Sequence, residues 1–326
     1  MKTYDMTHHL RRLVFGGLLL AAAALLPGCE DDPAVPDEEI STDPGTSAEP
    51  ETLRFISYNI LEGMKLDKQQ NFDNFAAWVR EKNPDFMALC ECNNFTEESL
   101  TALANRYGHT YAILCKETGY PVGLTSKYPI ELRSRMLEEV PLWHGALHLR
   151  IKDINVVVLH LYPFGTYPNG QGAAGSGDAY RDTEINCILD NTIRRYPAEP
   201  LWLMSGDFNS YSPKDADVMP ANTYYETHST VLRSGYADAL RDRHSQFFRS
   251  VPTVYGGWPD GNGRRIDYIY ASQAVMREIT CSEIIYDEFT DMHSDHYPVM
   301  IEFRHYPSGE QLSLIHISEP TRRVVI

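Results

Sequence analysis

One stretch near the middle of the chain limits the fold more than any other. Four apolar residues, Leu201–Met204, lead directly into Ser205-Gly206-Asp207-Phe208-Asn209-Ser210. A short apolar run bounded by glycine is typical of a buried strand that ends at a surface, where functional side chains are often placed. Asp207 and Asn209 are two positions apart, so an extended chain presents both on one face. The alternative is an Asx-turn that only closes the strand.

Other predicted strands also end in polar residues. Apolar runs lead into Asn59, Glu91 and His160, and Asp267 and Asp295 adjoin the strands predicted at 266–270 and 299–303. Helices are predicted within 72–83, 96–107 and 183–195, while 165–177 is predicted to be a long glycine-rich loop. This alternation predicts an α/β fold, a four-layer α-β-β-α sandwich of two packed mixed sheets. Six polar strand ends in one domain favour a catalytic site over a structural turn.

The N-terminus has the pattern of an export signal. Lys2, Arg11 and Arg12 precede an apolar run, Leu13–Leu26, which is shorter than the ~20 residues of a membrane span. The run ends just before Cys29. Residues 1–28 are therefore predicted to be a lipoprotein signal peptide with Cys29 as the lipidated residue. An ordinary secretory signal with an incidental cysteine is the alternative.

The next segment, 29–52, is rich in Asp, Glu, Pro, Ser and Thr, and is predicted to be a disordered acidic tether. The net charge of the chain is −16 at pH 7, and residues 53–311 remain acidic by themselves. Such a charge argues against a protein that grips long DNA through a basic face. Residues 53–311 are the length of one large domain, and 312–326 are interpreted as a non-native tail.

The cysteines predict neither a disulfide framework nor a structural zinc site. The chain has six, and assigning Cys29 to lipid leaves an odd number with no repeated spacing. Cys90 and Cys92 flank Glu91 and are interpreted as small buried residues.

The polar segments together resemble the endonuclease/exonuclease/phosphatase superfamily, which has the deoxyribonuclease-I-like fold. The most specific matches are Gly206-Asp207-Phe208-Asn209, Arg265-Ile266-Asp267-Tyr268 and Ser294-Asp295-His296, in the order that the family has them. The resemblance covers nearly all of 53–305. One departure is Cys90, where the family often has glutamine.

The resemblance implies a role for each matching residue. It makes Glu91 the principal carboxylate ligand of Mg²⁺ or Mn²⁺, with Asn59 and Asp295 in the same metal region. It makes Asp207 the group that orients or deprotonates the attacking water, and Asn209 a residue that holds the phosphate.

Two histidines complete the implied site. His160 and His296 would contact phosphate oxygens and stabilise charge in the transition state, and Asp267 would hold His296 in the useful tautomer. Glu117 is the carboxylate considered as a partner for His160. The sequence offers no serine elbow or Cys-His pair as a covalent nucleophile, so direct in-line attack by water is expected.

The predicted function is metal-dependent hydrolysis of phosphate esters, by a phosphodiesterase or phosphomonoesterase. The acidic domain and the aromatic loops with Phe164, Tyr167, Tyr255 and Trp258 favour a small phosphorylated molecule or a lipid headgroup. An extracellular nuclease acting on DNA or RNA is the alternative, since aromatic rings also stack on bases. A catalytically inactive surface binding module is the alternative of another class. A monomer anchored by lipid in the cell envelope, outside the cytoplasm, is expected.

Overall fold

The computed structural model describes residues 49–137, 142–170, 172–173, 175–257 and 263–307. The predicted signal peptide, Cys29, most of the predicted tether, Trp258 and the predicted tail lie outside these residues. Every helix among the described residues is too short or too polar to cross a membrane.

The strands form two mixed sheets of six strands each. In the first sheet the order is β11 (Ile279–Ile284), β12 (Val299–His305), β1 (Glu51–Asn59), β2 (Phe86–Cys90), β4 (Gly123–Ser126) and β3 (Tyr111–Leu114). In the second sheet it is β5 (Ile130–Met136), β6 (Ala146–Ile151), β7 (Ile154–His160), β8 (Trp202–Asp207), β10 (Asp267–Ser272) and β9 (Tyr236–Asp238).

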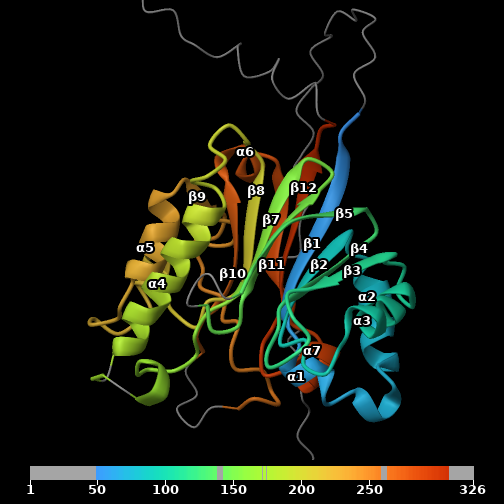
Figure 1. The fold of residues 1–326 in the computed structure, drawn as a ribbon, viewed down its shortest axis with the longest axis horizontal. Coiled ribbons are helices and arrows are strands. Elements are labelled where there is room, and N and C mark those ends of the chain that lie inside the picture. Colours follow the sequence, from blue (N-terminus) through green and yellow to red (C-terminus); the bar gives the residue numbers. More distant parts are fainter. Residues whose placement is uncertain (1–48, 138–141, 171, 174, 258–262, 308–326) are drawn as a thin grey trace, which may run out of the picture. The chain divides into compact units, whose positions relative to one another are not determined.

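Each sheet contains one parallel pair, and these two pairs position the site. β1 is parallel to β2 in the first sheet, and β7 is parallel to β8 in the second. All four strands run in the same general direction and end near α1 and α7 (Figure 1). Since the carboxyl ends of parallel strands meet at one edge of a sheet, this edge collects polar residues from both sheets.

Helices cover the outer face of each sheet, and the apolar residues sort accordingly. One core cluster fills the space between the sheets, and two further clusters lie beneath the helices. The α-helices are α1 (Leu61–Met64), α2 (Asp73–Lys82), α3 (Glu97–Asn105), α4 (Ser176–Asn191), α5 (Glu226–Arg233), α6 (Gln273–Met276) and α7 (Glu288–His293). Short 3₁₀ turns are η1 (Lys68–Gln70), η2 (Pro168–Gly170) and η3 (Pro213–Asp215). The four-layer α-β-β-α prediction is confirmed.

Two helices follow their local sequence signals closely. α2 ends at Lys82, and the C-cap residue Asn83 takes a left-handed conformation before Pro84. α3 begins after Thr96, which accepts the backbone N–H of Ser99 and forms a capping box with it. Both helices pack on the outer face of the first sheet.

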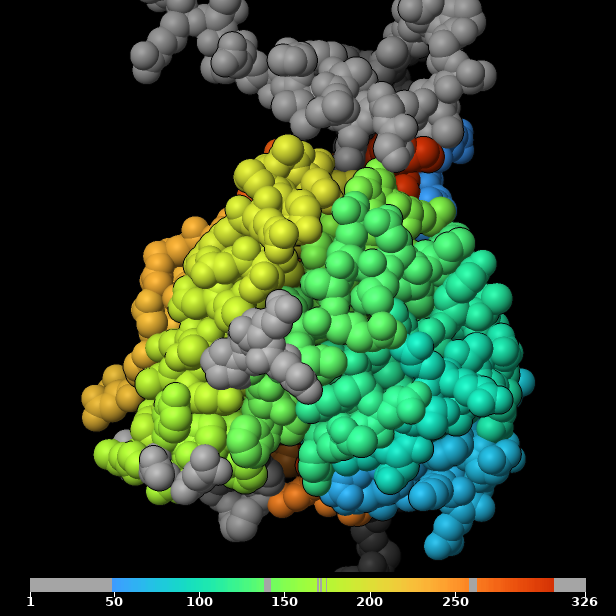
Figure 2. Space-filling model, in the orientation of Figure 1, coloured from blue at the N-terminus to red at the C-terminus, as the bar shows by residue number. Residues whose placement is uncertain are grey.

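Other boundaries differ from the prediction. α4 begins at Ser176, inside the stretch predicted as a loop, and ends at Asn191 instead of Arg195. Gly175, with φ of +89°, makes the turn into the helix, so the glycines before it are an entry to α4 as well as a loop. β1 begins at Glu51, two residues before the predicted start of the domain. In Figure 2 the yellow-green surface of α4 lies beside the green surface of residues near 150.

Candidate active site

Asn59, the last residue of β1, connects the two sheets. Its Nδ2 donates to Glu91 Oε1 at 3.2 Å and to Asp207 Oδ2 at 3.1 Å. Glu91 follows β2 of the first sheet, and Asp207 is the last residue of β8 in the second. One buried amide therefore holds two carboxylates that are 116 positions apart in the printed sequence.

The backbone around Glu91 is bent sharply so that its side chain turns into the site. Glu91 has φ of +61°, and its Oε2 accepts the backbone N–H of Glu62 at 2.8 Å. Gly63 donates its N–H to the Glu91 carbonyl at 2.6 Å. A Cβ on Gly63 would lie 2.1 Å from the carbonyl oxygen of Asn93, so only glycine allows this approach. Non-glycine residues with positive φ are often found at functional sites.

Asp207 is 2% exposed and lies at the centre of the polar group. Gly206, the residue before it, has φ of +141°, and a Cβ there would lie 1.8 Å from the carbonyl oxygen of Leu159. Glycine thus brings β8 close to β7 and places Asp207 beside His160. Burial raises the pKa of Asp207 to about 7, and the negative charge of Asp267 acts in the same direction. A carboxyl group with this pKa can exchange a proton at neutral pH.

Asn209 turns the chain away from β8 and supports Asp207. It has φ of +47°, and its backbone N–H donates to Asp207 Oδ1 at 2.9 Å. The side-chain Nδ2 donates to the carbonyl oxygen of Leu161 at 3.1 Å. The Asx-turn considered as an alternative is therefore present, and the chain is not extended from Asp207 to Asn209 as the prediction of a shared face assumed.

His296 and Asp267 form the pair that the family resemblance implies. His296 Nδ1 lies 2.8 Å from Asp267 Oδ2, and both residues are buried. Burial by itself would lower the pKa of His296, but the charges of Asp267 and Asp207 outweigh it and raise the pKa well above the ordinary value. His296 is therefore a cation beside two carboxylates.

Two serines hold this pair in place. Ser250 Oγ accepts the backbone N–H of Asp267 at 3.1 Å. Ser294 Oγ donates to the carbonyl oxygen of Asn59 at 2.7 Å and accepts the backbone N–H of His296 at 3.1 Å. Through Ser294 the segment before β12 is joined directly to the end of β1.

His160 reaches the site from the end of β7, but with a different partner from the one predicted. Its Nε2 lies 3.5 Å from Asp207 Oδ2, and its ring stacks on His144 with centroids 4.1 Å apart. The hypothesis that Glu117 pairs with His160 is not met, because Glu117 is exposed and its carboxylate accepts the backbone N–H of Glu97 at 3.1 Å. Burial and the nearby His144 and His296 lower the pKa of His160 well below its ordinary value.

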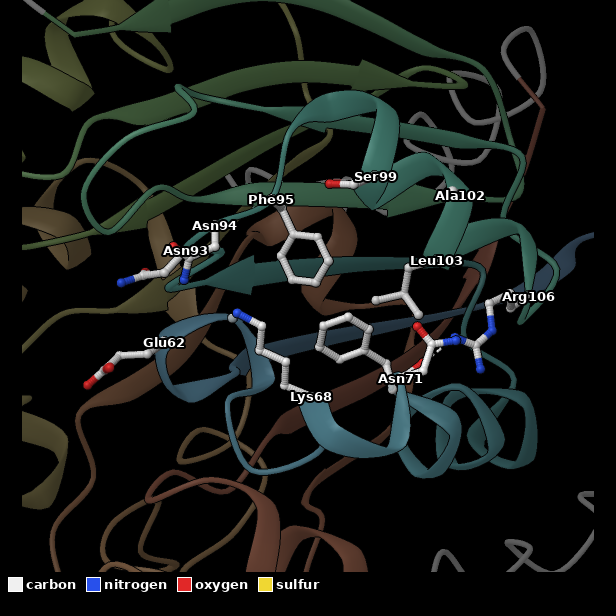
Figure 3. A pocket seen from close by; sticks show the side chains of 12 residues that line it. Glu62, Lys68, Asn71, Asn93, Asn94, Phe95, Ser99, Ala102, Leu103 and Arg106 are labelled. Atoms are coloured by element: carbon white, nitrogen blue, oxygen red, sulfur yellow. Dashed lines mark hydrogen bonds between the residues drawn. The ribbon is translucent and has the colours of Figure 1, made fainter.

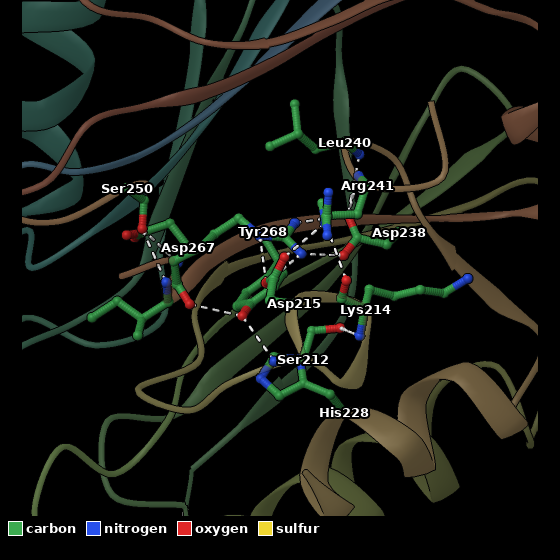
Figure 4. Close-up of polar contacts among 12 residues, drawn as sticks. Ser212, Lys214, Asp215, His228, Asp238, Leu240, Arg241, Ser250, Asp267 and Tyr268 are labelled. Atoms are coloured by element: carbon green, nitrogen blue, oxygen red, sulfur yellow. Dashed lines mark hydrogen bonds and ion pairs between the residues drawn. The ribbon is translucent and has the colours of Figure 1, made fainter. Parts of the chain in front are cut away.

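A buried ionic network lies directly behind Asp267 (Figure 4). The guanidinium of Arg265 donates to Asp215 Oδ2 at 2.7 Å and to both carboxylate oxygens of Asp238, at 2.8 and 2.6 Å. Arg241 adds a second ion pair to Asp215 at 3.0 Å. Two arginines and two aspartates thus compensate each other in the interior, and they fix the start of β10 where Asp267 stands.

The donor set fits a divalent cation. Glu91 accepts hydrogen bonds from the neutral amide of Asn59 and the N–H of Glu62, and burial together with the charge of Asp295 raises its pKa. A carboxylate held by neutral donors beside a second carboxylate is suited to Mg²⁺ or Mn²⁺. Asp207 and Asp267 also offer carboxylate oxygens, and His296 would offer a ring nitrogen in its neutral form; these atoms all lie within 4.8 Å of one another, which is consistent with a divalent metal at this end of the site.

A pocket of about 410 Å³ adjoins the Glu91 side of the site (Figure 3). Phe72 and Phe95 line it, with ring centroids 5.3 Å apart, and Lys68 and Arg106 add positive charge. Glu62, which holds Glu91 through its backbone, is at the edge of the pocket, and its carboxylate points away from the rings.

Sequence reasoning missed three residues that shape the site. They are His144, Ser250 and Ser294, and each lies outside a regular strand or helix. Ser294 belongs to a quoted motif, but its contact with Asn59 joins positions 235 residues apart. His144 and Ser250 carry no local pattern that could have indicated them.

Comparisons with known proteins agree with this geometry. Residues 56–296 match the model of the endonuclease/exonuclease/phosphatase family. An AP endonuclease from Archaeoglobus fulgidus is similar in structure, with 17% identity and a TM-score of 0.61, and the match covers 77% of this chain and 99% of that one. A 3' phosphatase from Neisseria, solved with a product DNA hairpin, has 17% identity, a TM-score of 0.58 and the same coverage. A search of curated proteins by sequence found no match.

The fold and the site define a hydrolase that acts on phosphate esters. The chain belongs to the endonuclease/exonuclease/phosphatase family and is a metal-dependent phosphoesterase.

Proposed function

We propose that this phosphoesterase hydrolyses small phosphorylated molecules or lipid headgroups by direct in-line attack of water, with Mg²⁺ or Mn²⁺ as the cofactor. The observation that supports the mechanism is the position of Asp207, a buried carboxyl group held by Asn59 and the backbone of Asn209, with His160 and His296 on either side.

Each site residue has a separate role in the proposed reaction. Glu91 and Asp295 would hold the cation, and Asn59 would position Glu91 through its amide; the cation when bound neutralises charge on the phosphate. Asp207 orients or deprotonates the attacking water. His296, kept positively charged by Asp267, stabilises the negative charge of the transition state, and Asn209 holds a phosphate oxygen. His160 is neutral and lies beside Asp207, and it donates a hydrogen bond to a phosphate oxygen.

The proposed substrate class rests on charge and on exposed rings. The chain carries a net charge of −16, and Phe164 and Tyr167 are 55% and 43% exposed. A strongly acidic protein repels long nucleic acid, whereas aromatic rings contact small organic groups.

Nucleic acid is the second candidate because the similar solved structures include an AP endonuclease and a phosphatase with bound DNA. A catalytically inactive binding module is the third, and the presence of every implied site residue argues against it.

The first experiment measures release of nitrophenolate from bis-4-nitrophenyl phosphate and 4-nitrophenyl phosphate. We expect activity that EDTA stops and Mg²⁺ restores, and that Asp207→Ala and His296→Ala both abolish. Unchanged activity in both variants would refute the mechanism. Parallel assays on plasmid DNA, RNA, phospholipids and sugar phosphates then rank the substrates, and fast nicking of plasmid DNA at physiological salt would favour the nuclease alternative.

We also propose that the enzyme is a monomer that works in the cell envelope, anchored by lipid on Cys29. The support is the order of segments at the N-terminus, a basic start, a short apolar run and a cysteine before an acidic stretch. Fractionation of cells that express the full chain or Cys29→Ala tests this proposal. Equal amounts of both in the soluble cytoplasmic fraction would contradict it.

A further inference from the structure

A continuous series of ring contacts runs from His160 toward the surface. His160 stacks on His144 with an angle of 20° between the rings. The edge of Tyr120 meets His144 at 5.6 Å, and Trp143 lies 6.5 Å from His144 and 5.1 Å from Tyr162. His160 ends β7, and the other residues come from three separate loops at the same end of the two sheets.

The outer rings of this series are open to solvent. Tyr120, Trp143, Phe164 and Tyr167 are 41%, 40%, 55% and 43% exposed. Phe164 contacts Tyr162 at 5.3 Å, and Tyr167 joins through Tyr180. We call these four exposed residues the aromatic rim. Single exposed rings are common, but a connected set that leads into a catalytic site indicates a binding surface.

The backbone of the rim is held by buried charges of α4. Glu184, which is 0% exposed, accepts the N–H of Trp143 at Oε1 and the N–H of Tyr162 at Oε2, both at 2.8 Å. Arg181 donates to the carbonyl oxygens of Tyr162 at 2.7 Å and Phe164 at 3.2 Å. Because burying such charges is costly, a carboxylate used only to fix two loops indicates that the position of the rings matters.

Two buried ring nitrogens beside the rim lack a partner. Nε2 of His144 and Nδ1 of His160 have no hydrogen bond among the described residues, although the two side chains are only 5% and 4% exposed. Buried polar atoms nearly always have a partner in folded proteins, so the polar contacts beneath the rim are incomplete at these two atoms.

We infer that the aromatic rim binds the organic group esterified to the phosphate and selects planar, ring-bearing groups over small alkyl groups. This inference rests on the proposed function, since it assigns the substrate class of the same site. A planar ring stacks on aromatic side chains over a large area, whereas a methyl group covers little of it. Glu184 acts as a positioning residue, because it touches the rim and not the substrate.

The test uses two monoesters that differ only in the organic group, phenyl phosphate and methyl phosphate, with release of inorganic phosphate as the readout. We expect the wild type to prefer the phenyl ester. Trp143→Ala and Tyr120→Ala should each lower kcat/KM for the phenyl ester about tenfold and for the methyl ester less than about twofold. If these variants lose activity equally on both esters, so that the ratio of kcat/KM for the phenyl ester to that for the methyl ester stays as in the wild type, the inference is wrong.

Tyr111 provides a matched control for Tyr120. It is 39% exposed, and it lies opposite Ser126, which in turn pairs with Phe86 at the far end of β2 from Glu91. Tyr111→Ala should leave both esters unchanged. Glu184→Gln keeps every ring but cannot accept both N–H groups, so the phenyl to methyl ratio should fall in this variant too. A purely structural role for Glu184 would lower both activities without moving the ratio.

A binding measurement separates failure of this inference from failure of the proposed function. Calorimetric titration of the full chain with phenylphosphonate and methylphosphonate requires no hydrolysis. Tighter binding of phenylphosphonate that Trp143→Ala removes would support the rim even if the wild type hydrolysed neither ester. Equal binding of the two phosphonates would overturn the inference whatever the hydrolytic activity.

Discussion

The two histidines of the site occupy opposite electrostatic environments around the same carboxylate. His160 Nε2 and His296 Nε2 lie 3.5 and 3.8 Å from Asp207 Oδ2. His296 has Asp267 at its other nitrogen, which helps to raise its pKa, whereas His160 has a neutral His144 ring at its face and a lowered pKa. Burial lowers the pKa of both imidazoles, and His296 differs in having a carboxylate at its other nitrogen that helps to outweigh this effect.

This difference separates two functions that one residue type could otherwise share. A cationic His296 can stabilise charge on the phosphate, and a neutral His160 can donate a hydrogen bond without attracting a second anion. The His296 side is built from buried ion pairs, and the His160 side from stacked rings and the clamp of Glu184. Four predictions test whether these supports differ in the way the structure implies.

The largest effect is expected from Asp267→Asn. The negative charge of Asp267 is the main cause that raises the pKa of His296. Without it His296 loses its positive charge more easily, so kcat at neutral pH should fall at least about a thousandfold. Adding His296→Gln to this variant should cost little more, because two residues that act as a unit give effects that do not add. Steady-state rates with bis-4-nitrophenyl phosphate decide the matter. Fully additive losses would show that the two residues act separately.

The second prediction concerns stability on the His296 side. Arg265→Met leaves Asp215 and Asp238 buried with less compensation, and should lower the free energy of unfolding by about 3–5 kcal/mol. Arg233 is the control, because its pair with Glu226 is exposed and Arg233→Met should cost less than about 1 kcal/mol. Urea unfolding followed by circular dichroism measures both. Similar losses in the two variants would contradict the importance of burial here.

The third prediction concerns pH on the His160 side. Burial raises the pKa of Glu184 to about 7, so the folded protein binds this proton more tightly than the unfolded chain does. The stability that this proton contributes is fully present below pH ~4.3 and is lost as the pH rises through 7, by up to about 4 kcal/mol. Glu184→Gln should lack this part of the pH dependence. The free energy of unfolding is measured from pH 5 to 8 for both proteins. The same pH dependence in wild type and variant would exclude the effect.

The smallest effect is expected at His144. Replacing it with alanine removes the ring that stacks on His160, and kcat should fall about tenfold, in line with ~1 kcal/mol for a ring pair. His144→Phe keeps a flat ring and should lose no more than about twofold. If phenylalanine were as harmful as alanine, the ring nitrogen of His144 would be the important group, and stacking would not.

The site residues differ in how far the sequence could predict them. Asn59, Glu91, His160 and Asp207 follow apolar strands, and the parallel pairs bring such positions together at one edge. Asp267 begins an antiparallel strand, so its place depends on pairing with Asp207; the sequence indicated it as a polar residue beside a strand, and the family motif implied its role. The two-sheet fold followed from the apolar runs and the helical periodicity.

The residues that the sequence did not indicate act through contacts between distant segments. Glu184 lies on α4, whose apolar residues are not gathered on one face, so the sequence does not show which side of the helix is buried. Its buried position depends on contacts with the loops of Trp143 and Tyr162. His144 was missed because a ring stack leaves no spacing rule. Glu117 was chosen for its position in the sequence, and its backbone contact with Glu97 removes it from His160.

The place of β12 between β1 and β11 also bears on how the protein is made. β1 pairs with β12, which is synthesised about 240 residues later. Ser294 and His296 come just before β12 in the sequence. Contacts of such long range form slowly, and β1 has an unpaired edge until β12 arrives. The nascent chain therefore contains Asn59, Glu91 and Asp207 before it contains His296. Phosphoesterase activity should begin only when β12 inserts into the sheet, so that a partly translated enzyme stays inert.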